Sequence, residues 1–202
     1  MKSYAILFSL LFHLALIGEA AAKDPYTTLK EPQPTQVTDG KIEVVEVFWY
    51  GCPHCYDFEP YVKNWLKKLP DNVEFRRVPG IFRESWIPHA RAYFTAIELG
   101  VLDRVHGPLF EAMHKEKQPL NTQSALRKFF QQHGVDGGEF DTIYESDAVN
   151  DKVKESFKAG RKYQIRGVPA LVVNGKYLVG TDTAGGQENM LKVVDQLVDK
   201  ES

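Results

Sequence analysis

The sequence contains little cysteine, little excess charge and no repeated segments. Only two of its 202 residues are cysteines, which excludes a small secreted fold held together by several disulfides. Its 25 Lys and Arg nearly balance 27 Asp and Glu, and without a basic block a nucleic-acid partner is not expected. The absence of internal repeats excludes a solenoid. With 43% hydrophobic residues, the chain can bury a core as one domain or as one domain with an insertion.

The only long apolar run lies at the N-terminus. After the positive charge of Lys2, residues 4–17 are apolar apart from Ser9 and His13, and Ala20-Ala21-Ala22 follows shortly afterwards. This pattern is typical of a signal peptide cut after Ala22, and an uncleaved anchor is the alternative. No later run is long enough to cross a bilayer. We therefore expect a soluble protein, exported to an oxidising compartment.

The two cysteines stand close together in the segment Gly51-Cys52-Pro53-His54-Cys55-Tyr56. A purely structural disulfide across so short a loop would stabilise the fold by only about 2 kcal/mol. A zinc site would need further ligands, and no pair of histidines follows at the usual spacing, so no metal is expected. The spacing therefore favours a redox-active pair, which needs no bound cofactor because the sulfurs themselves carry the electrons.

The sequence around the pair predicts a strand followed by a helix. Residues 42–49 are rich in β-branched and aromatic residues, Gly51 interrupts them, and apolar residues then recur at helical spacing as far as Leu69. Cys52 would thus begin the helix, where free backbone N–H groups and the helix dipole favour a thiolate. Pro53 suits the first helical turn, and Cys55 would lie one turn deeper on the same face.

His54 lies between the cysteines and can place a positive charge or an N–H donor near the Cys52 sulfur. The alternative is an ordinary solvated histidine. A stabilised Cys52 thiolate stabilises the reduced pair, which makes the disulfide a stronger oxidant. This reasoning predicts a protein that donates its disulfide.

Glu46 is a charged residue within an apolar strand. Strand alternation places it on the face of Ile42, Val44 and Phe48, which predicts burial, whereas Glu43 falls on the other face and receives no role. A buried carboxyl has a raised pKa and could exchange a proton with Cys55. The alternative is a glutamate at the strand edge that faces water.

These segments resemble the DsbA family of exported thiol:disulfide oxidoreductases. Residues 43–59, with Cys-Pro-His-Cys, resemble the active-site segment of that family, and Gly167-Val168-Pro169-Ala170 resembles its second active-site loop. The resemblance implies that Cys52 is attacked by substrate thiols and that Cys55 is the resolving cysteine. It further implies that Pro169 is cis and that the Val168 backbone pairs with a bound peptide. The family also has an acidic residue six positions before the first cysteine, where Glu46 stands.

The resemblance implies an α/β fold of the thioredoxin-like class, a central mixed sheet flanked by helices, with an inserted all-helical domain. We expect a signal peptide at 1–22, a first thioredoxin-like part at 23–84, a helical insertion at 85–157 and a second thioredoxin-like part at 158–202. Helical periods between 85 and 157 favour this division, as does a predicted hairpin at 171–179 with an Asn174-Gly175 turn.

The predicted function is that of a periplasmic thiol:disulfide interchange protein. It would donate the Cys52–Cys55 disulfide to reduced exported proteins through a mixed disulfide, and thereby assist oxidative folding. The resemblance implies reoxidation by a DsbB-type, quinone-linked membrane oxidase, and a monomer is expected. A reductase or isomerase of the same fold, or a peptide-binding chaperone module, remains as an alternative. Residues 23–40 leave no room for the dimerisation domain that precedes the catalytic domain in isomerases of this class.

Overall fold

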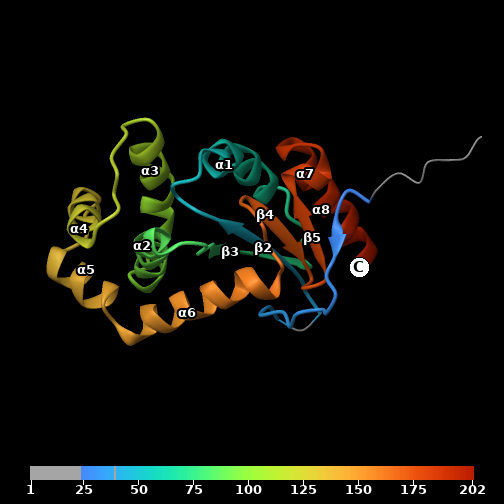
Figure 1. The fold of residues 1–202 in the computed structure, drawn as a ribbon, viewed down its shortest axis with the longest axis horizontal. Helices are drawn as coiled ribbons and strands as arrows, with labels where there is room; N and C mark the ends of the chain where they lie inside the picture. Colours follow the sequence, from blue (N-terminus) through green and yellow to red (C-terminus); the bar gives the residue numbers. More distant parts are fainter. Residues whose placement is uncertain (1–23, 39) are drawn as a thin grey trace, which may run out of the picture.

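The computed structural model describes residues 24–38 and 40–202, so the predicted signal peptide lies outside the described residues. A five-stranded sheet in the order β1-β5-β4-β2-β3 forms its centre (Figure 1). β2 pairs in parallel with β3 and antiparallel with β4, so the sheet is mixed as predicted. The strands are β1 (Thr27–Thr28), β2 (Ile42–Phe48), β3 (Val73–Pro79), β4 (Ala170–Val173) and β5 (Tyr177–Gly180).

Helices cover both faces of the sheet and form a separate group beside it (Figure 1). In chain order they are α1 (Pro53–Leu66), the short 3₁₀ helix η1 (Glu84–Trp86), α2 (Ile87–Glu98), α3 (Leu102–His114), α4 (Gln123–Gln132), α5 (Gly137–Tyr144), α6 (Asp147–Lys162), α7 (Thr181–Ala184) and α8 (Gln187–Glu201). None of the helices in the described part of the chain has the length and hydropathy needed to cross a membrane.

β2 is the central strand, and all seven of its residues are buried. One face packs on α1 and α8, where Val44 contacts a cluster that includes Phe58 and Val194. The other face carries Val45 and Val47 into a cluster that includes residues of α6 and the loop after it. Burial on both faces explains why the strand is an almost continuous apolar run.

The β4–β5 hairpin closes the sheet beside β2. Its turn consists of Asn174 and Gly175, with φ values of +49° and +63°. Positive φ at both central residues is the requirement of the tight hairpin turn that Asn-Gly favours. The hairpin predicted from these two residues is therefore confirmed.

Helices α2 to α6 lie between β3 and β4 in the chain, as a helical insertion in the thioredoxin-like sheet. Their buried side chains form one cluster that continues into Phe48, Tyr50 and both cysteines. Side-chain oxygens of Thr122, Asp136 and Ser146 cap α4, α5 and α6. The insertion therefore builds one wall of the region where the cysteines lie, and the predicted fold class is confirmed.

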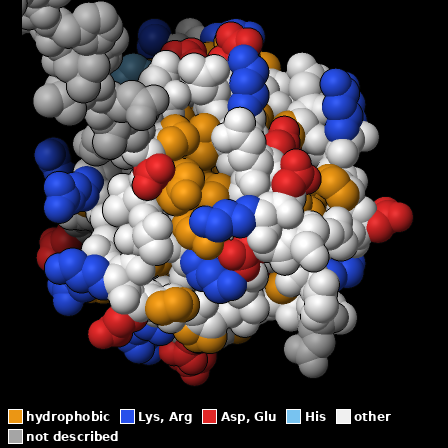
Figure 2. Space-filling view, turned by 90° about the vertical axis from the view of Figure 1, so that its right-hand side faces the viewer, with side chains coloured by type: hydrophobic (Ala, Val, Ile, Leu, Met, Phe, Trp, Pro, Cys, Tyr) orange, Lys and Arg blue, Asp and Glu red, His pale blue; other side chains and the backbone are white. Residues whose placement is uncertain are grey.

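The end of the molecule formed by β1, β5 and α8 carries charges of both signs. Figure 2 shows Lys and Arg interspersed with Asp and Glu on this side, around a small apolar area. This mixture matches the formal net charge of −2 for the whole chain.

Candidate redox-active site

Cys52 caps the N-terminus of α1, with φ −91° and ψ 116°, and Pro53 opens the helix as predicted. The Cys52 backbone N–H donates to the Trp49 oxygen at 3.0 Å. Between them, Gly51 passes close beneath the Trp49 ring, where an added Cβ would come within 2.3 Å of a ring carbon. Glycine thus leaves room for the Trp49 ring in the turn that connects β2 to the active-site helix.

The Cys52 sulfur lies where negative charge is stabilised. Its pKa is lowered to about 6, chiefly by a hydrogen bond from the Cys55 thiol. Burial acts against this, while the backbone N–H groups of Cys55 and His54 and the charge of His54 lower the pKa further. The helix-terminus argument therefore describes part of the effect, and the neighbouring thiol provides the largest part.

Cys55 is the opposite case, because it is fully buried. Burial raises the pKa of its thiol far above the ordinary value, and the neighbouring Cys52 and the charge of Glu46 raise it further. At neutral pH the reduced pair therefore holds one thiolate, on Cys52, and one proton, on Cys55. This asymmetry is the main chemical feature of the site.

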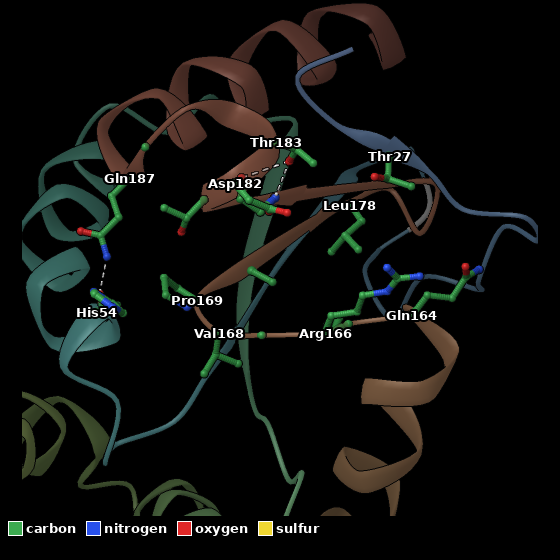
Figure 3. A pocket seen from close by; sticks show the side chains of 16 residues that line it. Thr27, His54, Gln164, Arg166, Val168, Pro169, Leu178, Asp182, Thr183 and Gln187 are labelled. Carbon is green, nitrogen blue, oxygen red and sulfur yellow. Dashed lines mark hydrogen bonds between the residues drawn. The ribbon is translucent and has the colours of Figure 1, made fainter. Parts of the chain in front are cut away.

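The second loop places backbone atoms beside the pair. The Val168–Pro169 peptide bond is cis, as the resemblance implied, and the Val168 oxygen lies 3.5 Å from the Cys52 sulfur. A cavity of about 770 Å³ adjoins this loop. In Figure 3, His54 and Gln187 lie on one side of the loop, and Arg166 and Gln164 lie on the other. The Gln187 side-chain amide donates a hydrogen bond to the His54 backbone oxygen.

Glu46 is fully buried, so the alternative of a strand-edge glutamate in water is wrong. Its Oε2 accepts a hydrogen bond from Arg77 Nε at 2.8 Å. Burial raises the pKa of Glu46 to about 7, although Arg77 lowers it in part and the charge of Glu59 adds to the rise. Its other oxygen, Oε1, has no hydrogen-bond partner among the described residues. The Glu46 carboxyl therefore ionises near neutral pH, and its charge acts on Cys55.

A buried polar network surrounds Glu46, and sequence reasoning missed it. Arg77 also reaches both carboxylate oxygens of Glu59 at 3.3 Å, and Glu59 accepts from His106 Nε2 at 3.2 Å. The other His106 nitrogen lies 2.7 Å from the Tyr50 hydroxyl. One signal was present: Glu59 follows Cys55 by four residues, which places both on one face of a helix.

Three aromatic residues, Trp49, Trp86 and Phe82, pack in a row next to the segment that carries the cysteines. Trp49 and Trp86 stack with ring centroids 4.0 Å apart, and Phe82 packs against Trp86. Phe82 is exposed, whereas Tyr50 is buried in the core. The sequence allowed Trp49, Tyr50, Phe82 and Trp86 either to line an apolar groove near the disulfide or to pack in the core; Tyr50 lies in the core and Phe82 at the surface.

Within residues 24–38 and 40–202, no group of three or more His, Cys, Asp or Glu side chains is arranged to hold a metal ion. The chemistry described for this site uses only the two sulfurs and the side chains around them.

Comparison with known proteins agrees with this geometry. The family described as the DSBA-like thioredoxin domain matches residues 78–192. The thiol:disulfide interchange protein DsbA of Pseudomonas aeruginosa is 43% identical over 201 residues, which cover 97% of this chain and 95% of the relative. The crystal structure of Pseudomonas aeruginosa DsbA matches with a TM-score of 0.84 at 43% identity, covering 88% of this chain and 92% of that one.

A more distant solved structure gives the same result. The oxidoreductase DsbA from Xylella fastidiosa matches with a TM-score of 0.82 at 34% identity, covering 87% of this chain and 94% of that one. The alignment with the Pseudomonas aeruginosa protein covers 97% of this chain and therefore includes the segment with both cysteines. The chain therefore belongs to the DsbA family of thiol:disulfide interchange proteins, and it is a thiol:disulfide oxidoreductase with Cys52 and Cys55 as its redox-active pair.

Proposed function

We propose that this protein works as an oxidant, donating the Cys52–Cys55 disulfide to reduced proteins. The observation that carries the proposal is the asymmetry of the two sulfurs: the pKa of Cys52 is lowered to about 6, while burial raises that of Cys55. A stabilised thiolate at Cys52 stabilises the reduced pair and makes Cys52 a good leaving group. Both effects favour transfer of the disulfide from this protein to the client.

The reaction proceeds in two exchanges. A client thiolate attacks the Cys52 sulfur, the Cys52–Cys55 bond breaks, and Cys55 leaves with the electron pair. Because Cys55 is buried, its thiolate takes a proton, and Glu46 supplies it. A second client thiolate then attacks the client sulfur of the mixed disulfide, and Cys52 leaves as a thiolate. The client gains a disulfide, and the protein is left with two reduced cysteines.

The Val168–Pro169 loop binds the client next to the reacting sulfur. The Val168 backbone lies beside Cys52, where an extended peptide can pair with it as an added strand. The adjoining cavity gives room for client side chains beyond the reacting cysteine. His54 stabilises the Cys52 thiolate through its backbone N–H and its charge.

The cellular setting follows from the family. We propose that the clients are reduced exported proteins in the periplasm, reached after removal of residues 1–22, and that the protein acts as a monomer. Reoxidation is assigned to a DsbB-type, quinone-linked membrane oxidase. The division at residues 84 and 157 into a split thioredoxin-like domain and a helical insertion stays part of this proposal.

The proposal is tested by equilibrating the protein with glutathione buffers of increasing oxidised fraction. An oxidant stays reduced until the buffer is far more oxidising than one that half-oxidises an ordinary structural pair. If the pair is as hard to reduce as a structural disulfide, the protein is not a disulfide donor, and a reductase is favoured. Cys52→Ser provides the control: it removes client oxidation if the protein is an enzyme, and leaves activity in cells unchanged if the protein is a peptide-binding module.

A further inference from the structure

One cation, Arg77, serves two carboxylates, of which Glu46 is fully buried and Glu59 is partly exposed. Arg77 contacts Glu46 through Nε at 2.8 Å and Glu59 through Nη2 at 3.3 Å. If both carboxylates were ionised, the cluster would carry a net negative charge away from water, which is costly. The cluster therefore favours holding one proton, and either Glu46 or Glu59 can carry it.

The position of that proton matters for the proposed reaction. Glu46 lies close enough to Cys55 to influence its ionisation, and its Oε1 has no partner in the described chain. Glu59 contacts Arg77 Nη2 and is partly exposed, and its charge is not among the main influences on Cys55. In the proposed reaction the proton that reaches the Cys55 sulfur comes from Glu46, the carboxylate whose charge acts on Cys55.

Among the described residues, His106 makes a hydrogen bond to Glu59 and none to Glu46. The Tyr50 hydroxyl lies 2.7 Å from His106 Nδ1, and because burial raises its pKa well above the usual value, it keeps a proton that it can donate to Nδ1. With Nδ1 accepting, the ring proton of neutral His106 lies on Nε2, which donates to Glu59 at 3.2 Å. A hydrogen bond donated to a carboxylate favours the ionised form.

We propose that His106 is a positioning residue that keeps Glu59 ionised, so that the proton shared by the two carboxylates resides on Glu46 beside Cys55. This inference rests on the proposed function and adds a residue that touches neither the sulfurs nor the client. The chain of effects runs from Tyr50 through His106, Glu59 and Arg77 to Glu46.

Two further titratable groups, Tyr93 and Asp103, act on His106 or Arg77 without a hydrogen bond to Glu59. Tyr93 of α2 packs against His106 and donates its hydroxyl to the Arg77 backbone oxygen at 3.3 Å, and burial raises its pKa above the neutral range. Asp103 of α3 acts on His106 only through its charge, and burial lowers the pKa of His106. Neither Tyr93 nor Asp103 donates to Glu59 in the structure, which leaves His106 and Arg77 to hold that carboxylate.

The test follows the carboxyl carbons of Glu46 and Glu59 by ¹³C NMR across pH in the oxidised protein, where no thiol titrates. Wild type should show Glu59 ionising below Glu46. In His106→Leu, Glu59 should take up the proton more readily, and the midpoint of Glu46 should fall by about one pH unit, since a charged neighbour has become neutral. His106→Gln keeps an N–H donor and should restore the wild-type order.

A double-mutant cycle separates action through Glu59 from a general change in packing. Glu59→Gln should itself lower the Glu46 midpoint, and adding His106→Leu to it should cause no further fall. A further fall in the double variant, or an unchanged Glu46 midpoint in a folded His106→Leu protein, overturns the proposal. If His106→Leu does not fold, an unchanged midpoint in Glu59→Gln overturns it instead.

The same variants predict a rate effect with a defined pH dependence. The rate at which glutathione opens the disulfide, relative to wild type, should be unchanged near pH 5, where Glu46 is protonated in both proteins. Above pH 7 it should fall toward roughly one tenth in His106→Leu. His133→Gln, in the helical insertion, should follow wild type at every pH. Because the NMR result does not depend on redox direction, a protein that fails the glutathione equilibrium can still pass or fail this test.

Discussion

Two buried glutamates on the same strand show what turns an ion pair into an acid–base group. Glu43 and Glu46 both lie on β2, and each accepts a hydrogen bond from the Nε of an arginine on β3, at 2.7 and 2.8 Å. Both are fully buried, and each keeps one oxygen without a hydrogen-bond partner in the described chain. By residue type, burial and pairing the two are nearly identical.

The difference lies in what else each arginine contacts. Among the residues that the structure describes, Arg76 pairs with no carboxylate besides Glu43, and its Nη2 donates to the Tyr163 hydroxyl. Arg77 is shared between Glu46 and Glu59, and Cys55 lies nearby. The Glu43 pair is balanced one to one, whereas the Glu46 cluster has an excess carboxylate. The excess negative charge, together with the nearby sulfur, distinguishes the proposed proton donor Glu46 from the ion pair of Glu43.

The largest expected effect is on stability, and it has opposite signs at the two positions. The pKa of Glu46 is about 7 in the folded protein, above its ordinary 4.5, so the folded state loses stability as pH rises from about 4.5 to 7. Glu46→Gln removes this loss. The free energy of unfolding of Glu46→Gln minus that of wild type should therefore be about 3 kcal/mol larger at pH 8 than at pH 4. Glu43→Gln breaks a balanced pair and should be destabilising at both pH values. Urea unfolding of the oxidised proteins measures both.

If the stability of Glu46→Gln relative to wild type is the same at pH 4 and pH 8, Glu46 ionises without cost. The comparison of the two glutamates would then have no energetic basis.

The next effect is on rate. In the proposed reaction Glu46 delivers the proton to Cys55, so Glu46→Gln should slow opening of the disulfide by glutathione on the order of 100-fold at pH 7. Glu43→Gln should react at the wild-type rate, since its pair lies on the other face of the sheet. Stopped-flow tryptophan fluorescence follows the reaction. Equal rates in wild type and Glu46→Gln would remove Glu46 from the mechanism.

The smallest effect concerns His54, whose charge is the weakest of the causes that lower the Cys52 pKa. His54→Leu keeps the backbone N–H groups and the Cys55 thiol in place, so the Cys52 midpoint should rise by less than about one pH unit. The rate of alkylation with iodoacetamide as a function of pH reports this midpoint. A rise to the value of free cysteine would mean that the side chain of His54, rather than the thiol of Cys55, holds the thiolate.

Strand alternation was sufficient to predict that Glu46 is buried, because the apolar neighbours on its face of the strand can be identified from local sequence alone. The positions of Cys52 and Pro53 at the helix start followed from local sequence for the same reason. Arg77 and His106 could not be found in this way. Their contacts depend on the register between β2 and β3 and on how α3 packs, which bring together residues 31 and 47 positions apart.

Sequence reasoning also assigned Glu43 to the correct face but did not predict its burial with Arg76. Alternation identifies a face, but it does not show that α6 covers the second face of the sheet. The domain boundaries at residues 84 and 157 stay predictions, and α6 runs through the second of them to Lys162.

The central claim is that the two sulfurs differ in how readily they ionise, and titration of the reduced protein tests it most directly. Thiolate absorbance near 240 nm should show one sulfur ionising with a midpoint of about 6, absent in Cys52→Ser, and no second ionisation below pH 9. A single ordinary step near 8.5 for Cys52 would contradict the account, because the thiolate would then not stabilise the reduced pair and the disulfide would not be a strong oxidant.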